Sequence, residues 1–300
     1  MIATTALLTV AMAWMASQPP APHDRAFWLT LAQNKFELPA GENAFDLLVE
    51  MNGLVGSTDP LLRDEVAYGA AARWMYRARL LTPDQQKQIV EMWTRNLSAG
   101  IGERGTDSVF RRSFSALNLS VAAALDHEAP FLSETEFESL LTRAIEYLAG
   151  ERDGRGYDPV KGWIHAPAHT ADLLKFLARN AKLTRDSQPR ILGALSGACA
   201  GAGHPFAWGE EARLAQVVRS LVRRADFDAR AFESWLALVP PQRQQVWAMA
   251  PAIDPELFAA VHNITAVLRA AFVALSLDSD LTPGAVEARQ RILEVLGKLS

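Results

Sequence analysis

The sequence contains almost no cysteine, no excess of basic charge and no segment of low complexity. Its 300 residues include a single cysteine, Cys199, so no disulfide can form within the chain and a cysteine-based metal site is not expected. Small apolar residues surround Cys199, which predicts a buried structural thiol rather than a nucleophile. The formal net charge of −4 argues against a general nucleic-acid binder, because such a protein needs a basic face to neutralise phosphates. We therefore expect no nucleic-acid partner.

Several catalytic signatures are also missing. The chain has no Gly-x-Ser-x-Gly motif, no Walker loop and no dinucleotide-binding fingerprint, and no Ser-His-Asp arrangement can be recognised. Alternation of apolar and polar residues, which is typical of half-buried strands, is hard to find. These absences argue against the common enzyme classes that are built on a central sheet.

Helical periodicity is abundant instead. Apolar residues recur at spacings of three and four over much of the chain after residue 44. The segments with this pattern are 45–54, 61–81, 89–97, 110–125, 137–148, 173–183, 214–222, 232–239, 257–277 and 292–299. A hydrophobic content of 49% is ample for a sizeable core, so we expect residues 23–300 to form a single all-helical domain.

The expected helix starts carry capping residues. A capping side chain stands directly before a proline at Asp59, Thr82, Asp254 and Thr282. Thr82 with Gln85, and Ser133 with Glu136, have the spacing of a capping box. Helices with such starts and short connections predict an all-α fold of antiparallel helical hairpins stacked into a layered or solenoid-like (α-α superhelix) array. The sequence shows no repeat of fixed period, so no regular named solenoid is indicated.

The first 22 residues have the character of a leader. An apolar segment is followed by a proline-rich stretch, with small residues at plausible cleavage spacing, although no Lys or Arg precedes the apolar run. We expect a signal peptide and an exported or periplasmic protein; the alternative is an ordinary N-terminal helix in a cytoplasmic protein. No later stretch is judged long and apolar enough to span a bilayer, so no transmembrane span is expected after the leader.

The densest polar stretch is E-R-D-G-R-G-Y-D-P-V-K-G-W-I-H-A-P-A-H-T-A-D-L-L, residues 151–174. Its first half predicts a loop of about a dozen residues, in which Gly154 and Gly156 would allow positive φ angles. The charged residues of this loop could hold it together as an ion network; they are Glu151, Asp153, Arg155 and Asp158.

The second half carries His165, His169 and Asp172, a residue set that is known to bind zinc or non-haem iron. Pro167 is tolerated only in the first turn of a helix, so the helix must begin between about residues 163 and 166. His165 would then lie at or before the cap, where helical spacing does not fix its direction. The zinc signature of helices also places a glutamate after the first histidine, and here Ala166 stands in that position.

Other roles are open for these residues. His165 could cap the helix, His169 could pair with Asp172 or a loop carboxylate, and Trp163 could belong to the core.

Three further polar clusters lie at expected helix starts. The charges of segment 62–68, among them Glu65, suit helix capping or a solvated face. Segment 111–115 has two arginines and two serines, which could hold an anion, although a salt-bridged surface is commoner. In segment 208–213, Glu210 and Arg213 have the spacing of an intrahelical pair. Together these clusters supply opposite charges that could line one groove.

Four segments resemble a known family. They are L-R-D-E-V-A-Y-G near residue 62, R-S-F-S-A-L near 112, the 151–174 stretch, and F-A-W-G-E-E-A-R-L-A near 206. They are similar to an uncharacterised bacterial family, the domain of unknown function 2785, over about residues 40–280. The resemblance implies an all-helical fold and a bacterial origin, but no established activity. The residues that match the family's motif positions are Glu65, Asp153, Arg155, His165, His169, Asp172, Glu210 and Arg213.

These observations favour a binding or scaffolding module for a peptide, a protein or a small polar ligand. Its polar groove would be centred on residues 151–172 and would include Trp163 with the motif residues. The alternative is a metal-dependent, hydrolase-like enzyme. In that hypothesis His165, His169 and Asp172 bind a divalent metal, the only cofactor considered, while Asp153 or Glu151 acts as base and Arg155 stabilises negative charge. A second alternative is a purely structural buried ion network.

Overall fold

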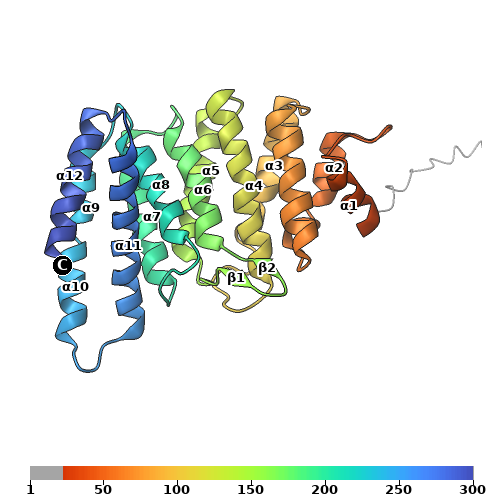
Figure 1. Cartoon of the computed structure of the whole chain (residues 1–300). Coiled ribbons are helices and arrows are strands. Elements are labelled where there is room, and N and C mark those ends of the chain that lie inside the picture. The colour runs from red at the N-terminus through yellow and green to blue at the C-terminus, as the bar shows by residue number, and fades with distance from the viewer. Residues whose placement is uncertain (1–22, 300) are drawn as a thin grey trace, which may run out of the picture.

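The computed structural model describes residues 23–299. The part it describes consists of helices joined by short connections, with one small β-hairpin (Figure 1). The elements are α1 (Arg25–Gln33), α2 (Ala44–Met51), η1 (Leu54–Gly56), η2 (Leu61–Tyr68), η3 (Ala71–Arg77), α3 (Pro83–Asn96), α4 (Ser108–Glu128), α5 (Glu134–Gly150), β1 (Tyr157–Asp158), β2 (Gly162–Trp163), α6 (Ala166–Arg179), η4 (Arg185–Ser187), α7 (Gln188–Gly201), α8 (Glu210–Val222), α9 (Ala229–Leu236), α10 (Val239–Ala248), α11 (Pro255–Leu277) and α12 (Pro283–Lys298).

The helices form two layers. In one layer α4, α6, α8 and α11 lie side by side, each packed against the next; in the other, α5 packs on α7, α7 on α9, and α9 on α12 (Figure 1). The pairs α3–α4 and α5–α6 are successive antiparallel hairpins that connect the layers. The prediction of an all-α, solenoid-like array is therefore confirmed.

The predicted capping residues are at the helix starts with one exception, because the N-cap of η2 is Pro60 rather than Asp59. Thr82 and Ser133 each form a complete capping box with the Gln or Glu three residues later. The side chains of Asp254 and Thr282 accept backbone N–H groups in the first turns of α11 and α12. These bonds satisfy donors that the helix itself leaves without partners, which explains why the helices begin at these points.

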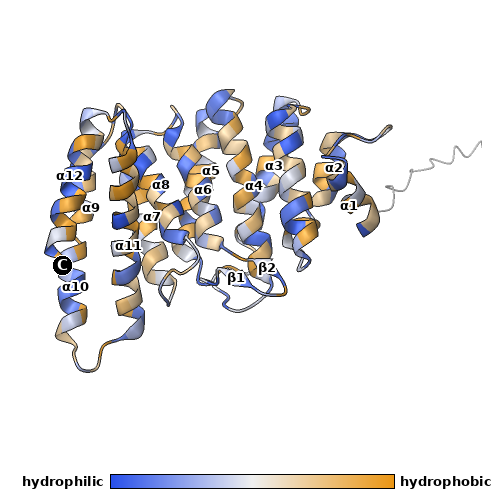
Figure 2. Ribbon diagram, in the orientation of Figure 1, coloured by the Kyte–Doolittle hydropathy of each residue, from blue (hydrophilic) through white to orange (hydrophobic). Residues whose placement is uncertain are grey.

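Buried apolar side chains from helices of both layers form the hydrophobic core, and Figure 2 shows that hydrophobic and hydrophilic residues alternate along most helices. The largest fully buried side chains include Trp28, Trp74 and Trp93. Cys199 is 1% exposed, and its burial raises the pKa of the thiol. The prediction of a structural cysteine is confirmed.

The helix expected over residues 61–81 has a different form. Its backbone is wound as two π-helical segments, η2 and η3, joined at Gly69 and Ala70. The Phe36 ring packs against Gly69 so closely that a Cβ there would lie 2.4 Å from a ring carbon. The apolar spacing of three and four residues does not distinguish this wider winding from an α-helix. Such π-helical turns occur frequently at functional sites.

The judgement that no segment after the leader is long and apolar enough to span a bilayer was wrong for α11, whereas the absence of a transmembrane span stays a prediction. This helix has 23 residues and a mean hydropathy of 1.6 in its most apolar window, so it is long and apolar enough by length and composition. It packs against α7, α8, α10 and α12, as a core helix of the array would. Residues 1–22, where a signal peptide is predicted, lie outside the described residues.

Candidate binding site

Residues 151–172 lie where the parallel helices α4, α6 and α8 begin (Figure 1). The chain leaves α5 at Gly150, and β1 then pairs antiparallel with β2 before α6 starts at Ala166. The Asp158 carboxylate closes the turn between the strands by accepting the N–H groups of Val160 and Lys161, both at 2.8 Å. Strands of two residues are too short to show alternation, which is why the sequence did not indicate this hairpin.

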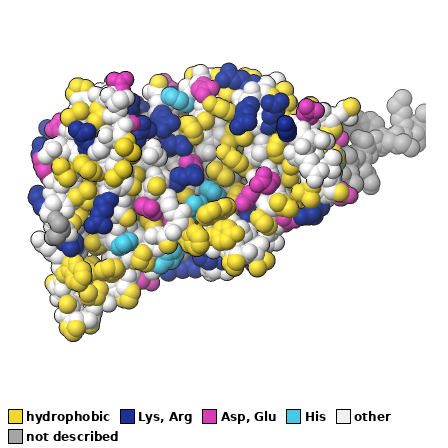
Figure 3. Space-filling view, in the orientation of Figure 1, with side chains coloured by type: hydrophobic (Ala, Val, Ile, Leu, Met, Phe, Trp, Pro, Cys, Tyr) yellow, Lys and Arg dark blue, Asp and Glu magenta, His cyan; other side chains and the backbone are white. Residues whose placement is uncertain are grey.

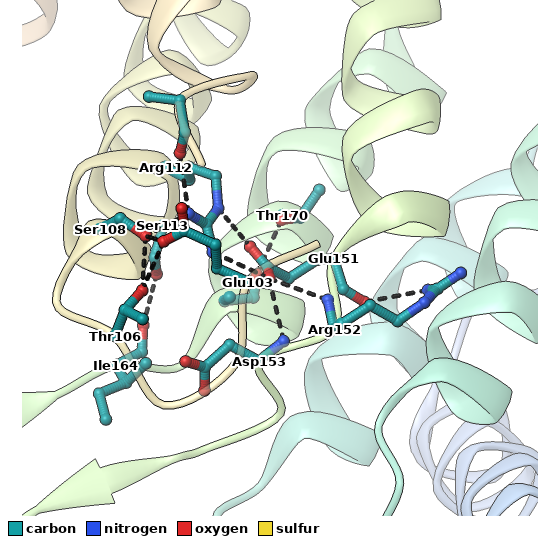
Figure 4. A network of polar contacts seen from close by, with 12 residues as sticks. Glu103, Thr106, Ser108, Arg112, Ser113, Glu151, Arg152, Asp153, Ile164 and Thr170 are labelled. Atoms are coloured by element: carbon teal, nitrogen blue, oxygen red, sulfur yellow. Dashed lines mark hydrogen bonds and ion pairs between the residues drawn. The ribbon is translucent and has the colours of Figure 1, made fainter. Parts of the chain in front are cut away.

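A buried ion pair between Arg112 and Glu151 holds the start of the loop against α4 (Figure 4). The guanidinium donates Nε to Oε2 at 2.8 Å and Nη2 to Oε1 at 3.1 Å, and the two side chains are 0% and 3% exposed. Nη1 of Arg112 also donates to the Ala99 carbonyl, while Glu151 accepts the N–H groups of Arg152 and Asp153. Both buried charges are therefore fully hydrogen-bonded, which offsets part of the cost of removing them from water.

A second ion pair continues the network. Asp153 is buried and accepts Nε of Arg155 at 2.8 Å and the N–H of Gly105 at 3.0 Å. Arg155 also donates to the Thr106 carbonyl at 2.9 Å. The expected ion network includes Glu151, Asp153 and Arg155, whereas Asp158 belongs to the hairpin turn instead.

The Arg63 side chain holds strand β2 in place. Its buried guanidinium donates to the carbonyls of Lys161, at 2.6 Å, and of Trp163, at 3.2 Å, and lies over the Phe110 ring at 4.1 Å. We had expected the charges of this segment to serve as helix caps or a solvated face, and for Arg63 that was wrong. The burial of its neighbour Asp64 raises the pKa of that carboxyl to about 6.

His165 is the residue before α6 and has a left-handed backbone, with φ 51° and ψ 32°. Its Nε2 lies 2.9 Å from the Trp208 carbonyl, to which it donates, and 3.6 Å from a Glu210 carboxylate oxygen. His165 is the N-cap residue of α6, as considered from the sequence, but it caps through its backbone carbonyl, which accepts the His169 N–H at 2.9 Å, and its side chain forms no capping hydrogen bond. Burial lowers the pKa of His165, although Glu210 acts in the opposite direction.

His169 lies one turn further along α6, with its ring centre 5.7 Å from that of His165. Its Nδ1 is 2.8 Å from Oγ of Ser113, and this hydroxyl donates its one hydrogen to the Ile164 carbonyl. Nδ1 must therefore carry the ring hydrogen, and Nε2 the lone pair. Because the hydroxyl hydrogen is already engaged, Ser113 and His169 do not form a nucleophile–base pair. Burial lowers the pKa of His169 well below its usual value, so the ring is neutral near pH 7.

Asp172 bonds to two cations. One oxygen accepts Nζ of Lys175 at 2.8 Å, and the other accepts Nη1 of Arg213 from α8. The expected Glu210–Arg213 pair was therefore wrong; Glu210 accepts the Trp208 N–H at 2.9 Å instead.

Within residues 23–299, no group of three or more His, Cys, Asp or Glu side chains is arranged to hold a metal ion. In this arrangement His165, His169 and Asp172 are not grouped as a set of three ligands.

Three aromatic side chains form the outer surface of the site. We call Tyr157, Trp163 and Trp208 the aromatic platform; they are 42%, 40% and 48% exposed. Their ring centres lie 5.0 to 6.2 Å apart, and Trp163 stacks on the His165 ring at 4.7 Å. Trp163 is therefore not a core residue. On the face shown in Figure 3, hydrophobic side chains gather beside histidine and acidic side chains.

Gly156 is needed beside the platform because it has no Cβ, not because it adopts an unusual backbone conformation. A Cβ at this position would lie 2.2 Å from the Trp208 indole. Neither Gly154 nor Gly156 has the positive φ that we expected for them.

The structure thus brings together most of the predicted site residues. Asp153 pairs with Arg155, whose carbonyl accepts the His165 N–H at 3.2 Å. The His165 ring contacts Trp163, His169 and Glu210. Asp172 pairs with Arg213, and both act electrostatically on His165. Glu65 does not join these residues, because its side chain is exposed and forms no hydrogen bond or ion pair with them within the described residues. Sequence reasoning missed Tyr157 and Arg63, and the only signal for Arg63 was its place in the L-R-D-E segment.

Comparison with curated proteins and with solved structures gave no match. Residues 97–275 match the family described as protein of unknown function (DUF2785). This range contains the ion network, both histidines and the aromatic platform, whereas Glu65 and Arg63 lie before it. The chain belongs to the DUF2785 family.

Proposed function

We propose that this protein is a binding module whose ligand stacks on the aromatic platform beside the Asp172–Arg213 pair. Indole and phenol rings offer large apolar surfaces that lose little conformational entropy on binding, which is why they dominate many recognition sites. Three such rings exposed side by side form an apolar patch, and apolar patches of this kind mark interaction sites on protein surfaces.

The observation that supports this proposal best is the contrast between the platform and the rigid layer beneath it. Arg63 and Arg112 are both fully buried, although apolar residues of similar volume often stabilise a fold equally well. His165 has a strained left-handed backbone, and such strain is commonly found at functional sites. A fold that needed only stability would bury the rings and leave the charges outside. The buried ion network and the binding role are therefore compatible, because the network holds the aromatic platform in place.

The rim of the platform indicates the kind of ligand. The Arg213 side chain is 51% exposed, and Asp172 occupies only part of its hydrogen-bonding capacity. A ligand with one apolar or flat face and an adjacent carboxylate, carbonyl or hydroxyl group would satisfy both parts of the site. A short peptide segment or a small polar molecule has this character.

A metal-dependent enzyme is the second candidate, and one observation favours it. The hydrogen bonds of the two neighbouring histidines leave Nε2 of His169 and Nδ1 of His165 as lone-pair nitrogens. Asp172 would first have to leave Lys175 and Arg213 to join them. Elemental analysis of the purified protein beside a His169→Ala variant tests this candidate. Stoichiometric metal that disappears in the variant would support it, and no metal in either protein would contradict it.

The binding proposal is tested by the indole N–H resonances of the protein. A panel of short peptides and oligosaccharides is added to ¹⁵N-labelled protein, and the shifts of Trp163 and Trp208 are followed. Trp247 is the internal reference, because it is 50% exposed but lies on α10 outside the site. Selective shifts at the two platform indoles support the proposal. Ligands that shift all exposed indoles alike, or none, contradict it.

A further inference from the structure

The hairpin of α10 and α11 extends beyond the body of the array (Figure 1). Its end, which we call the hairpin tip, is the segment V-W-A-M-A-P-A-I over residues 246–253, and it contains no charged residue. Trp247 is 50% exposed, and Ala250, Pro251 and Ala252 are exposed as well. Phe258, on the adjoining turn of α11, adds a further ring that is 38% exposed.

Three backbone N–H groups of the tip are hydrogen-bonded within the tip itself. Met249 donates its N–H to the Val246 carbonyl, Ala250 to Trp247, and Ala252 to Met249, at 2.9 to 3.2 Å. Pro251 has no N–H to satisfy. Directly after the tip, the Asp254 carboxylate accepts two N–H groups at the start of α11. Pairing these donors within the chain lowers the cost of moving the tip into the interfacial region of a bilayer, where the remaining carbonyls can still meet water and headgroups.

We propose that the hairpin tip inserts into the interfacial region of a lipid bilayer and attaches the array to a membrane surface. Trp and Phe side chains favour the boundary between headgroups and acyl chains, where Trp247 and Phe258 would then lie. The tip and the β1–β2 hairpin project from the same edge of the array in Figure 1, so an attached molecule would turn its platform edge towards the membrane.

A second copy of the chain fits the tip less well. The tip is convex and would need a concave apolar acceptor. Two grooves run along α5, with volumes of about 750 and 1070 Å³. Their rims carry charged side chains, among them Lys87, Glu91, Arg143 and Glu146. If the uncharged tip of a second copy bound in such a groove, it would bury these charged side chains without a hydrogen-bonding partner, which disfavours a dimer of this kind.

Vesicle binding tests the proposal. The full chain is mixed with sucrose-loaded phosphatidylcholine vesicles, with and without phosphatidylglycerol, and the bound fraction is measured after sedimentation. Wild-type protein should bind, and Trp247→Glu and Ala252→Asp should each lower the partition coefficient about tenfold, because each places a charge in the interface. Leu277→Asp is the matched control, since Leu277 is 81% exposed but lies at the other end of α11. It should bind as wild type does, and melting curves should show all variants folded.

A second measurement locates the contact. Brominated lipids should quench part of the tryptophan fluorescence of the wild type, and this part should be absent in Trp247→Phe, which keeps an apolar ring. Failure of the wild type to sediment with vesicles would overturn the proposal, as would equal losses in the tip variants and in Leu277→Asp. Self-association in solution that needs the tip, without vesicle binding, would also overturn it and assign the surface to a second copy.

Discussion

His169 is neutral in the folded protein because its burial, and the neighbouring His165 and Arg213, lower its pKa, although the hydrogen bond with Ser113 acts in the opposite direction. In the unfolded chain a histidine binds a proton below about pH 6.5. The pKa of His169 is lower in the folded state, so its contribution to stability is fully present above about pH 6.5. This contribution is lost as the pH falls below about 6.5, because the unfolded chain then binds a proton that the folded protein does not. The fold should therefore weaken between pH 6.5 and 5 partly through this residue.

Replacement of His169 by Asn tests this origin of the acid sensitivity. The amide keeps a donor near Nδ1 for Ser113 but does not titrate, so the melting temperature should fall less steeply from pH 7 to pH 5 than in the wild type. Thermal melts by circular dichroism across this range provide the measurement. His127→Asn serves as the control, because His127 is exposed at the end of α4. Identical slopes for His169→Asn and wild type would contradict the role given to His169.

Gly156 tests the packing of the platform without any change of charge. Gly156→Ala places a Cβ where the Trp208 indole lies, so the ring must move and the near-ultraviolet circular dichroism of the aromatic platform should change. Gly193→Ala in α7 is the matched control, because a Cβ there meets nothing within 4 Å. Since alanine is favoured over glycine inside a helix, the control should raise the free energy of unfolding by about 0.5–1 kcal/mol. An unchanged spectrum for Gly156→Ala would show that Trp208 does not lie against this glycine.

At the scale of elements, the buried Arg112–Glu151 pair connects α4 to the end of α5. Arg112→Met leaves the Glu151 carboxylate buried without its partner, which should lower the free energy of unfolding by about 3–5 kcal/mol. Arg143→Met provides the comparison, because Arg143 pairs with Glu146 while both side chains are more than half exposed. That change should cost about 0–1 kcal/mol. Denaturant unfolding of the two variants checks the difference, and equal losses would contradict the importance given to the buried pair.

The same elements show what the sequence could predict. Capping residues and apolar spacing are local signals, so the starts of α3, α5, α11 and α12 were predicted correctly. Pro167 likewise placed the start of α6, because a proline is excluded from a helix interior.

The hydrogen-bonding partners of the site residues could not be predicted from such local signals. Arg63 meets the carbonyls of Lys161 and Trp163 about one hundred residues further along the chain, and Arg213 meets Asp172 on another helix. Such pairings depend on how the helices stack, and no local pattern specifies that. A charged residue at a helix start was therefore interpreted as a surface group, although Arg63 is fully buried.

At the scale of the whole molecule, stability should be greatest in the layer that carries the site. Most residues of α4 and α6 are buried, whereas only Val239 and Val246 are buried in α10. Buried, well-packed helices open only through large unfolding events, while exposed hairpins open locally. Amide hydrogen exchange followed by mass spectrometry should therefore be slowest in α4 and α6 and much faster in α10. Comparable protection of α10 in the isolated protein would contradict this distribution.

The array also explains why the site forms at all. Because α4, α6 and α8 lie parallel in one layer, their first turns meet at one edge, where Ser113 of α4 contacts His169 of α6 and Glu210 of α8 lies beside His165. Residues from three separate segments thereby support a surface that no single segment could hold.

The central claim is that a ligand binds on the aromatic platform, and calorimetric titration tests it most directly. The tightest ligand from the panel is titrated into the wild type, Trp208→Ala and Trp247→Ala. Loss of a platform ring should weaken binding at least about tenfold, since such central aromatic residues typically contribute about 2 kcal/mol or more and about 1.4 kcal/mol corresponds to a factor of ten. Trp247→Ala, which removes an equally exposed indole outside the site, should leave the affinity unchanged. Equal affinities of all three proteins would contradict the account.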